Sequence, residues 1–453
     1  MILKRARNFL FKTIIKCLIV IVPVIFFSIP AYASEAAASA PAFVRLTEQG
    51  FIDPTFNSGK GVFTYVKADQ EIAGINSIYS DYRNRIVTLG GMDFTFTRFL
   101  RNGKLDIGFN FHGIQRIKPN KSELKFSNGI NIRKRLKLSH SIIALGTGMR
   151  PIGPSLETRT VMMRLTEFGA LDHTFGEEGV VDLARELGLQ RDTFKPVSIV
   201  DLPDDRYIMF TEISKVSGGG FQLALVALNS NGTVASNYGD NGIVRINIDR
   251  NVSAVKLLEF GAHWYLVTRS APTETKRGGI LIVRVNRETG ELDSDYANNG
   301  ILETVFNTGD INVTSASMYA DRMVVAGQIA DGVGVAVYKR DTGQLDLNFS
   351  GDGKRVIRKD EHFLKVADVV VNHQNKVFIG GTATKQGAGS GLMFIAVLEN
   401  DGGFDSATSL RSFTGFTNPD GQVPAKVLGY TAKTMYLEPE GGILLGGNMN
   451  YAR

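Results

Sequence analysis

The chain has 453 residues, of which 51 are Lys or Arg, 45 are Asp or Glu and only one is cysteine. Five of the basic residues and none of the acidic ones lie in the first 33 residues, so the remainder has 46 against 45 and a charge near +1. This balance gives no electrostatic reason to expect nucleic acid or an anionic membrane as a partner. The single cysteine, Cys17, excludes disulfides and thiolate metal sites from the rest of the chain.

The N-terminus has the features of a secretory signal peptide. Five basic residues are followed by an apolar run of 13 residues, 17–29, and then by Ala-Tyr-Ala at 31–33. The run is too short for an ordinary membrane span, so we predict a cleaved signal peptide over 1–33 and no transmembrane span in the mature chain. An uncleaved anchor is the alternative. The Ala-rich residues 34–41 read as a flexible leader, and export to the periplasm, the cell surface or the medium is expected.

The rest of the chain repeats one pattern seven times. Its turn glycine recurs at intervals of 53 to 66 residues, at Gly50, Gly103, Gly169, Gly232, Gly290, Gly343 and Gly402. Three residues later stands an aspartate, except at Ala235: Asp53, Asp106, Asp172, Asp293, Asp346 and Asp405. Three residues further on stands an aromatic residue in six units: Phe56, Phe109, Phe175, Tyr238, Tyr296 and Phe349. Such a period has to be explained by any fold assigned to the chain.

Each unit also contains four short apolar runs rich in Val, Ile and aromatic residues, such as 160–165, 180–183, 196–200 and 206–210. These are strand signals, and no window has a sustained helical period. The pattern predicts an all-β fold, a seven-bladed β-propeller of four-stranded antiparallel blades, over residues 42–453. The chain starts in the second half of a unit at 43–47 and stops before that half at 442–448. We therefore expect the N- and C-terminal strands to pair and close the ring, which a solenoid would not need.

The unit resembles the delta-60 repeat of bacterial proteins, which reads L-x-x-D-G-x-L-D-x-x-F-G-x-D-G and continues as D-G-K-I-x-V-x-G. The resemblance spans roughly residues 42–448, although the second half of the motif is degenerate. It implies a secreted or envelope β-propeller and brings no catalytic motif. The matching positions are Leu165, Gly169, Leu171, Asp172, Phe175, Gly176 and Gly179, and later Lys376, Val377 and Gly380.

We assign structural roles to the repeated residues. The aspartate is placed to accept backbone N–H groups of its turn, and the aromatic residue to pack between neighbouring blades. Calcium is the functional alternative, because Asp240-Asn241-Gly242 and residues 350–353 are rich in oxygen. Neither has the ligand spacing of a calcium loop or its distal glutamate. We therefore expect no metal and no cofactor.

The candidate binding residues lie in loops whose length varies between units, at 146–160, 214–220, 270–279 and 384–391. In an antiparallel blade these loops all emerge on one face, opposite the repeated turns. Loops on a rigid scaffold commonly carry binding residues, although they also tolerate inert insertions. The basic side chains there suggest a mouth that binds an acidic glycan or a protein partner: Arg150, Arg159, Lys215, Lys276, Arg277 and Lys385.

We expect a monomeric binding or scaffold protein without catalytic residues. The six histidines are scattered, and no nucleophile-elbow motif is present. The alternative is an enzyme that acts on polysaccharide through a carboxylate pair at the channel mouth. Its candidate carboxylates are Glu71, Asp81, Asp201 and Glu259.

Overall fold

The computed structural model describes residues 37–57, 59–65, 74–90, 94–117, 125–134, 140–152, 155–189, 193–214, 221–406, 409–414, 416 and 426–452. Within it, Ala38–Ala452 form one compact unit. The signal peptide expected over 1–33 lies outside the described residues. No helix among the described residues is long and apolar enough to cross a membrane.

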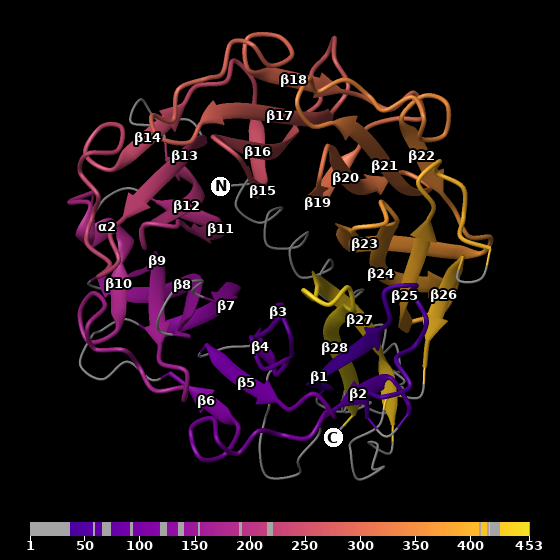
Figure 1. Ribbon diagram of the computed structural model, residues 1–453, viewed down its shortest axis with the longest axis horizontal. Helices are drawn as coiled ribbons and strands as arrows, with labels where there is room; N and C mark the ends of the chain where they lie inside the picture. The colour runs from indigo at the N-terminus through magenta and orange to yellow at the C-terminus, as the bar shows by residue number, and fades with distance from the viewer. Residues whose placement is uncertain are drawn as a thin grey trace, which may run out of the picture. The chain divides into compact units, whose positions relative to one another are not determined.

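Seven four-stranded antiparallel sheets are arranged in a ring, which confirms the predicted β-propeller (Figure 1). Blade 1 consists, from the centre outward, of β27 (Val427–Leu437), β28 (Ile443–Ala452), β1 (Ala37–Leu46) and β2 (Val62–Thr64). Blade 2 consists of β3 (Ser77–Ser80), β4 (Ile86–Gly90), β5 (Thr95–Phe99) and β6 (Ile114–Arg116). Blade 3 consists of β7 (Lys125–Lys134), β8 (Ile142–Ile152), β9 (Ser155–Leu165) and β10 (Val180–Asp182).

The other four blades follow the same order. Blade 4 consists of β11 (Phe194–Asp201), β12 (Tyr207–Ser214), β13 (Phe221–Leu228) and β14 (Ile243–Ile246). Blade 5 consists of β15 (Val252–Phe260), β16 (His263–Ser270), β17 (Gly279–Asn286) and β18 (Ile301–Thr304). Blade 6 consists of β19 (Asn312–Tyr319), β20 (Arg322–Ile329), β21 (Gly332–Lys339) and β22 (Lys354–Ile357). Blade 7 consists of β23 (His362–Val371), β24 (Val377–Lys385), β25 (Gly391–Leu398) and β26 (Leu410–Phe413).

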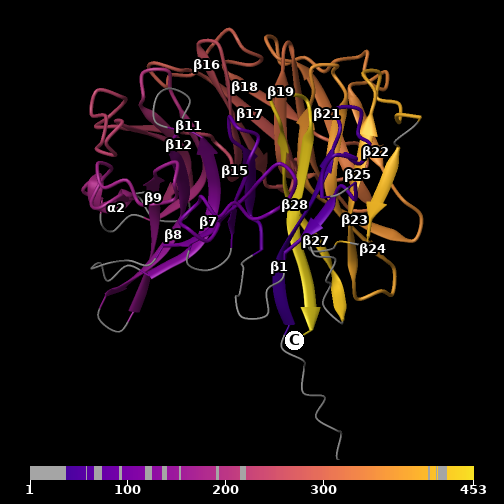
Figure 2. The ribbon, with the colours of Figure 1, turned by 60° about the horizontal axis from the view of Figure 1, so that its bottom comes forward.

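The ring closes in the way that was predicted from the two ends of the chain. The N-terminal strand β1 pairs with the C-terminal strand β28 inside blade 1, and Figure 2 shows the two side by side. A side-chain bond adds to this closure, because Arg45 on β1 donates to Glu438, just after β27, over 2.8 Å. Both side chains are almost fully buried. Closure leaves neither terminal strand as an open sheet edge.

Two details differ from the expectations. Residues 37–41, expected in a flexible leader, belong to β1, where the carbonyl of Pro41 accepts the hydroxyl of Thr64 over 3.0 Å. Buried alanines such as Ala40 are small enough for the crowded space between β28 and β2. The part of the chain that the structure describes also includes one short helix, α2 (Leu183–Glu186), whose first turn is capped by the side chain of Asp182. It lies between β10 and β11.

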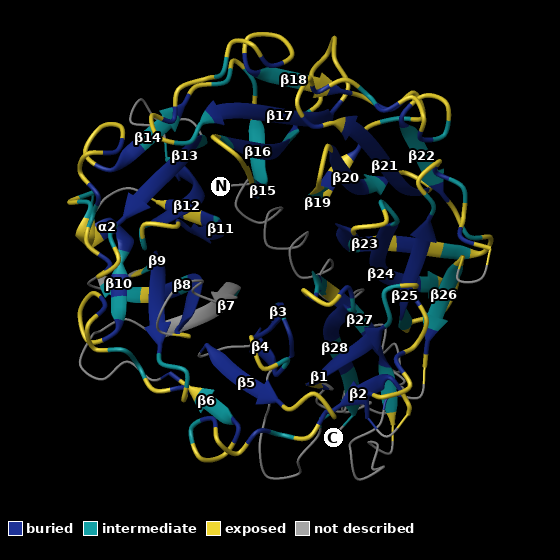
Figure 3. Cartoon of the chain, viewed as in Figure 1, coloured by how far each residue is buried: buried dark blue, intermediate teal, exposed yellow. Residues whose placement is uncertain are grey.

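The apolar core lies between blades rather than in one centre. In one cluster, Val335 of blade 6 packs with Val369 and Phe394 of blade 7. Strands buried on both faces explain why the middle strands are nearly continuous apolar runs. Figure 3 shows the buried residues on the strands and the exposed ones on the loops. Each blade is therefore stabilised by its neighbours, as expected for a repeat ring.

Candidate functional site

The loop that joins the third and fourth strands of each blade contains the repeated glycine, followed by the aspartate except in blade 4 and by the aromatic residue except in blade 7. We call these loops the signature turns, and their side of the ring the signature face. The aspartate accepts a backbone N–H two residues later, as predicted. Asp106 accepts from Gly108 over 3.0 Å, and Asp172 accepts from Thr174 over 3.0 Å. The same bond is made by Asp53, Asp293 and Asp346. The calcium alternative is not needed to explain these aspartates.

The pairing of the repeated aspartate with an arginine was not predicted from the sequence. Arg98 donates to Asp106, and Arg164 to Asp172, each over 2.7 Å from the penultimate residue of the third strand. Arg45 and Arg284 make the same pair in blades 1 and 5. In blades 6 and 7 that position holds valine, and the cation comes instead from the start of the second strand, as Arg322 in β20 and Lys376 just before β24. The basic residue eight or nine positions before the aspartate was the available signal.

The repeated aromatic residue packs between blades, which confirms its predicted role. Phe109 is fully buried and lies under Gly169, the turn glycine of the next blade. A Cβ at Gly169 would come within 2.8 Å of the Phe109 ring, and its φ of +88° is strained for other residues. The guanidinium of Arg98 lies 4.7 Å from the same ring centroid. One blade's aromatic residue is thus sealed by the next blade's turn.

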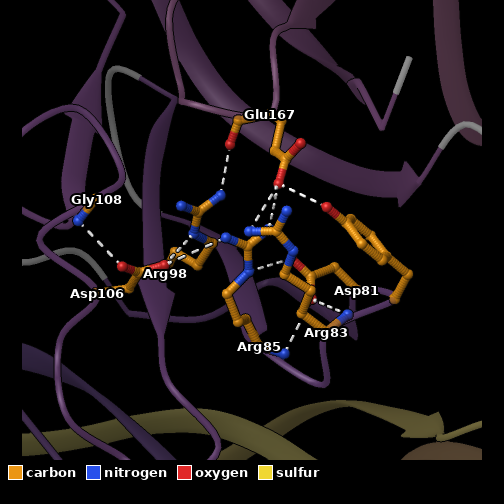
Figure 4. Close-up of polar contacts among 8 residues, drawn as sticks. Asp81, Arg83, Arg85, Arg98, Asp106, Gly108 and Glu167 are labelled. Carbon is orange, nitrogen blue, oxygen red and sulfur yellow. Dashed lines mark hydrogen bonds and ion pairs between the residues drawn. The ribbon is translucent and has the colours of Figure 1, made fainter.

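A further ionic cluster joins blades 2 and 3 on the signature face (Figure 4). Glu167, in the blade 3 turn, accepts from Arg85 over 3.0 Å and from the Tyr82 hydroxyl over 2.9 Å. Arg85 also binds Asp81 over 2.6 Å. Burial by itself would raise the pKa of Glu167. Hydrogen bonds from Tyr82 and Arg85, with the charges of Arg83 and Arg85, outweigh burial and hold that pKa below its ordinary value.

The central channel is lined by the first strand of each blade, and six of these strands, all but β3, carry a β-bulge. In blades 4, 5, 6, 7 and 1 a bulge is followed by a polar residue, namely Ser198, Lys256, Ser315, Asp368 and Thr434. Bulges commonly redirect a side chain. Here they bring residues of four blades together around one carboxylate.

Asp368 is the centre of that cluster and is 7% exposed. The ammonium of Lys256 lies 3.1 Å from its Oδ1, and the hydroxyl of Ser315 donates to the same atom. The amide of Met435 donates to Oδ2 over 2.8 Å. Asp368 thereby links blade 5, blade 6 and blade 1 across the channel wall. Every one of these contacts comes from a donor, so the carboxylate of Asp368 holds strands of neighbouring blades together.

Beside this cluster lies a pocket of about 570 Å³ between blades 5, 6 and 7. It is formed where β15, β19 and β23 begin, on the face that carries the variable loops, which we call the variable face. Among its described lining residues, Arg269 and Lys365 are charged and none is acidic. Phe363 lines it with 63% of its surface exposed. We call this pocket the channel mouth.

Two polar side chains of the channel mouth, Arg269 and Gln328, are bonded to its wall. Arg269 donates to Asn312 and holds that amide against the wall. Gln328 donates its amide hydrogens to the carbonyls of Ile329 and Gly332, whereas its Oε1 is buried and finds no donor among the described residues. A buried acceptor without a donor is unfavourable until a ligand or water satisfies it.

The predicted basic loop residues are distributed around the variable face. Lys276 and Lys385 have well exposed side chains, and each lies near a glutamate, Glu303 at 3.9 Å and Glu361 at 3.5 Å respectively. Arg277 donates to the carbonyl of Asn307 over 2.6 Å and so anchors its own loop. These residues belong to two blades and do not form one cluster by direct contact.

The prediction that Arg150 and Arg159 lie in a loop is wrong. Residues 146–160 are mostly paired strand, because β8 and β9 continue as a long hairpin in which Arg150 lies opposite Glu157. Arg159 is 3% exposed and binds the partly exposed Glu157 over 2.5 Å, so its own side chain is buried rather than part of an open mouth. The threonines of this segment pair well across strands, which favours sheet over loop. Lys215 lies outside the described residues.

The sequence did not single out Arg269, Phe363 or Lys365. They lie in or beside strands, whereas the candidate residues were chosen from loops of variable length. The only signal was a charged or aromatic side chain in a position that alternation assigns to solvent, as with Phe363 and Lys365 in the first strand of blade 7. Ring closure decides which blades are neighbours, and therefore which of their residues come into contact.

The carboxylates proposed for an enzyme have structural partners where the structure describes them. Asp81 binds Arg85, and Glu259 lies 3.2 Å from Arg287 of its own blade. Asp201 ends β11 and is buried, and Glu71 lies outside the described residues. Within the described ranges, no group of three His, Cys, Asp or Glu side chains is placed to hold a metal ion.

Comparison with known proteins supports no family. No family model matches the chain, and no curated protein matches it. Solved structures with a similar arrangement include the Dos1 propeller, at TM-score 0.41 and 9% identity over 83% of this chain and 92% of that one. Drosophila Plexin A in complex with Semaphorin 1b gives TM-score 0.39 and 10% identity over 84% and 87%. The β-propeller domain of the Trilobed protease from Pyrococcus furiosus gives 0.34 and 11% over 79% and 87%.

Proposed function

We propose that the protein is an exported, non-enzymatic binding propeller that takes an acidic glycan at the channel mouth. The observation that supports this most directly is the pocket itself, whose described lining residues include two cations and an exposed aromatic ring but no carboxylate. Small-ligand sites typically combine apolar walls with a few placed polar groups. The delta-60 resemblance and the signal-peptide pattern support export from a bacterial cell.

Each group has a distinct task in this proposal. Arg269 and Lys365 pair with the carboxylates of successive sugar residues, because charge-assisted hydrogen bonds are about twice as strong as neutral ones. The ring of Phe363 packs against the apolar face of a sugar. Lys256 and Asp368 hold the first strands behind the mouth and keep the pocket in shape.

Binding to an anionic polymer tests the proposal. Purified protein is applied to immobilised polygalacturonate, with dextran as a neutral polymer of similar size. Arg269→Ala and Lys365→Ala should each weaken binding to polygalacturonate about tenfold, and Phe363→Ala by about threefold to tenfold. Raising the salt concentration should weaken wild-type binding, because exposed ion pairs are screened.

Lys276→Ala is the matched control, since it removes an exposed basic side chain from the same face outside the pocket. It should leave the affinity within about twofold. Equal binding to dextran, or a loss with Lys276→Ala but not Arg269→Ala, would contradict the assigned site. Cleavage of the polymer would favour the enzyme alternative. Capture of a protein partner without polymer binding would favour a protein ligand.

A further inference from the structure

The signature face carries a group of large apolar side chains where blades 2 and 3 meet. Phe111 is 87% exposed, Ile107 73%, Phe168 67% and Leu100 36%. The first two belong to the blade 2 signature turn and Phe168 to the blade 3 turn. Figure 3 shows much of the loop between β5 and β6 as exposed. Single exposed apolar residues are common, but a group of four with two phenylalanines is typical of an interaction site. We call it the blade 2–3 patch.

The patch is held rigidly from below. The amide of Asn110, next to Phe111, donates to the carbonyl of Phe168 over 2.7 Å and joins the two turns. Arg98 connects them again by binding Asp106 and the carbonyl of Glu167 (Figure 4). Side chains carried on a fixed backbone lose less entropy on binding than those on a mobile loop. The two turns therefore present one preformed surface.

Charge is unevenly distributed across this surface. On the side of blade 1 stand Arg101 and Lys104, because Gly103 between them lies against Phe56 of blade 1. On the side of blade 4 stand Glu177 and Glu178, next to Gly176, whose amide donates to Asn231 of blade 4. All four are exposed. Arg101 is already paired with Glu440 over 3.2 Å and Glu177 with Arg185 over 2.5 Å, whereas Lys104 and Glu178 form no ion pair among the described residues. Lys104 and Glu178 therefore provide the charge at the two ends. Along the ring the order is therefore basic, apolar, apolar, acidic.

We infer that the blade 2–3 patch is a dimer interface with a second copy of this chain. A two-fold axis through the apolar centre places the basic end of one copy against the acidic end of the other, and the same contact is then made twice. An isologous interface needs this self-complementarity. Phe111 and Phe168 bury one another's rings at the centre, where aromatic residues contribute most to binding. A partner of a single charge sign would leave one end of the patch facing a like charge.

The dimer leaves both variable faces free, because the patch lies on the opposite face of the ring. Two channel mouths on one particle would let it hold a repeating polymer at two points, which raises the effective affinity without any new contact. The dimer interface does not depend on the ligand, because it is tested by the molecular mass of the protein in solution.

Sedimentation equilibrium of the purified protein between about 1 and 100 µM tests the interface. Wild type should reach twice the chain mass. Phe111→Ser combined with Phe168→Ser should raise the dimer dissociation constant at least about a hundredfold. Leu347→Ser is the matched control, since Leu347 is 65% exposed and follows the blade 6 aspartate as Ile107 follows Asp106. It should leave the dissociation constant unchanged.

Charge reversal tests the two-fold geometry. Lys104→Glu should weaken the dimer about tenfold, because it places like charges together at both ends of the interface. Adding Glu178→Lys should restore the affinity to within about threefold of wild type. A monomeric wild type over the whole range, open-ended assembly beyond two copies, a dimer indifferent to the phenylalanine changes, or no rescue by the second reversal would each overturn the inference.

Discussion

In blade 4, the amide nitrogen of Ala235 donates to the carbonyl oxygen of Ala227 over 3.0 Å. In blade 3 the corresponding bond joins Asp172 to Arg164 over 2.8 Å. Blade 4 thus keeps the backbone of the signature turn although both members of its ion pair are alanine. The turn backbone is common to both blades. The ion pair adds stability to it, and both members of the pair can be absent together.

Removing one partner should therefore be worse than removing both. Arg164→Ala should lower the free energy of unfolding by about 2 to 3 kcal/mol, because it leaves Asp172 partly buried without its cation. Arg164→Ala combined with Asp172→Ala should be less destabilising than the sum of the single changes, because it recreates the pattern of blade 4. Urea unfolding of the three variants gives the coupling energy. Additive single effects would show that the two side chains do not act together.

The buried aromatic residue of a signature turn should matter far more than an exposed apolar residue of the same turn. Phe349 is fully buried and Leu347 is 65% exposed, two residues apart in blade 6. Phe349→Ala should destabilise by about 3 to 5 kcal/mol through the cavity it leaves. Leu347→Ala should change stability by less than about 0.5 kcal/mol. Thermal and urea unfolding of both variants measure the contrast, and equal effects would contradict the packing of Phe349 under the blade 7 turn.

Stability should fall in acid through Glu167. Its pKa in the folded protein lies below the ordinary value of 4.5, because hydrogen bonds from Tyr82 and Arg85 outweigh burial. A depressed folded pKa contributes stability that is complete above the unfolded pKa and is lost as pH falls through the folded pKa. The free energy of unfolding should thus decrease below about pH 4.5. Glu167→Gln should be less stable at neutral pH and show a weaker dependence below that pH in a urea series; an unchanged slope would reject the assignment.

Closure of the ring should depend on β1. A chain that begins at Ala37 keeps the whole of β1 and should unfold cooperatively in urea. A chain that begins after Leu46 loses the strand between β28 and β2, and with it the partner of Glu438. Unpaired strand edges promote aggregation, so the shorter chain should be insoluble or much less stable. A soluble shorter chain with native circular dichroism would show that blade 1 closes without β1.

The repeated pattern in the sequence was sufficient to predict the number of blades, the strands in each and the pairing of the chain ends. These follow from local rules, since short apolar runs bounded by turn residues form strands, and a glycine followed three residues later by an aspartate forms a turn. The pattern also predicted the roles of Asp172 and Phe175. It failed at residues 37–41 and 146–160, because composition there suggested loops whereas cross-strand pairing, a tertiary interaction, made them strands.

Only the tertiary structure decided which side chains meet across blades. Lys256 and Asp368 are 112 positions apart, and their contact depends on two bulges and on the curvature of the ring. The channel mouth and the blade 2–3 patch are likewise built from residues on separate blades. No local period encodes such meetings, because the angle between blades is fixed by how their buried faces pack. The sequence therefore determined the scaffold, and packing between blades decided where the scaffold can bind.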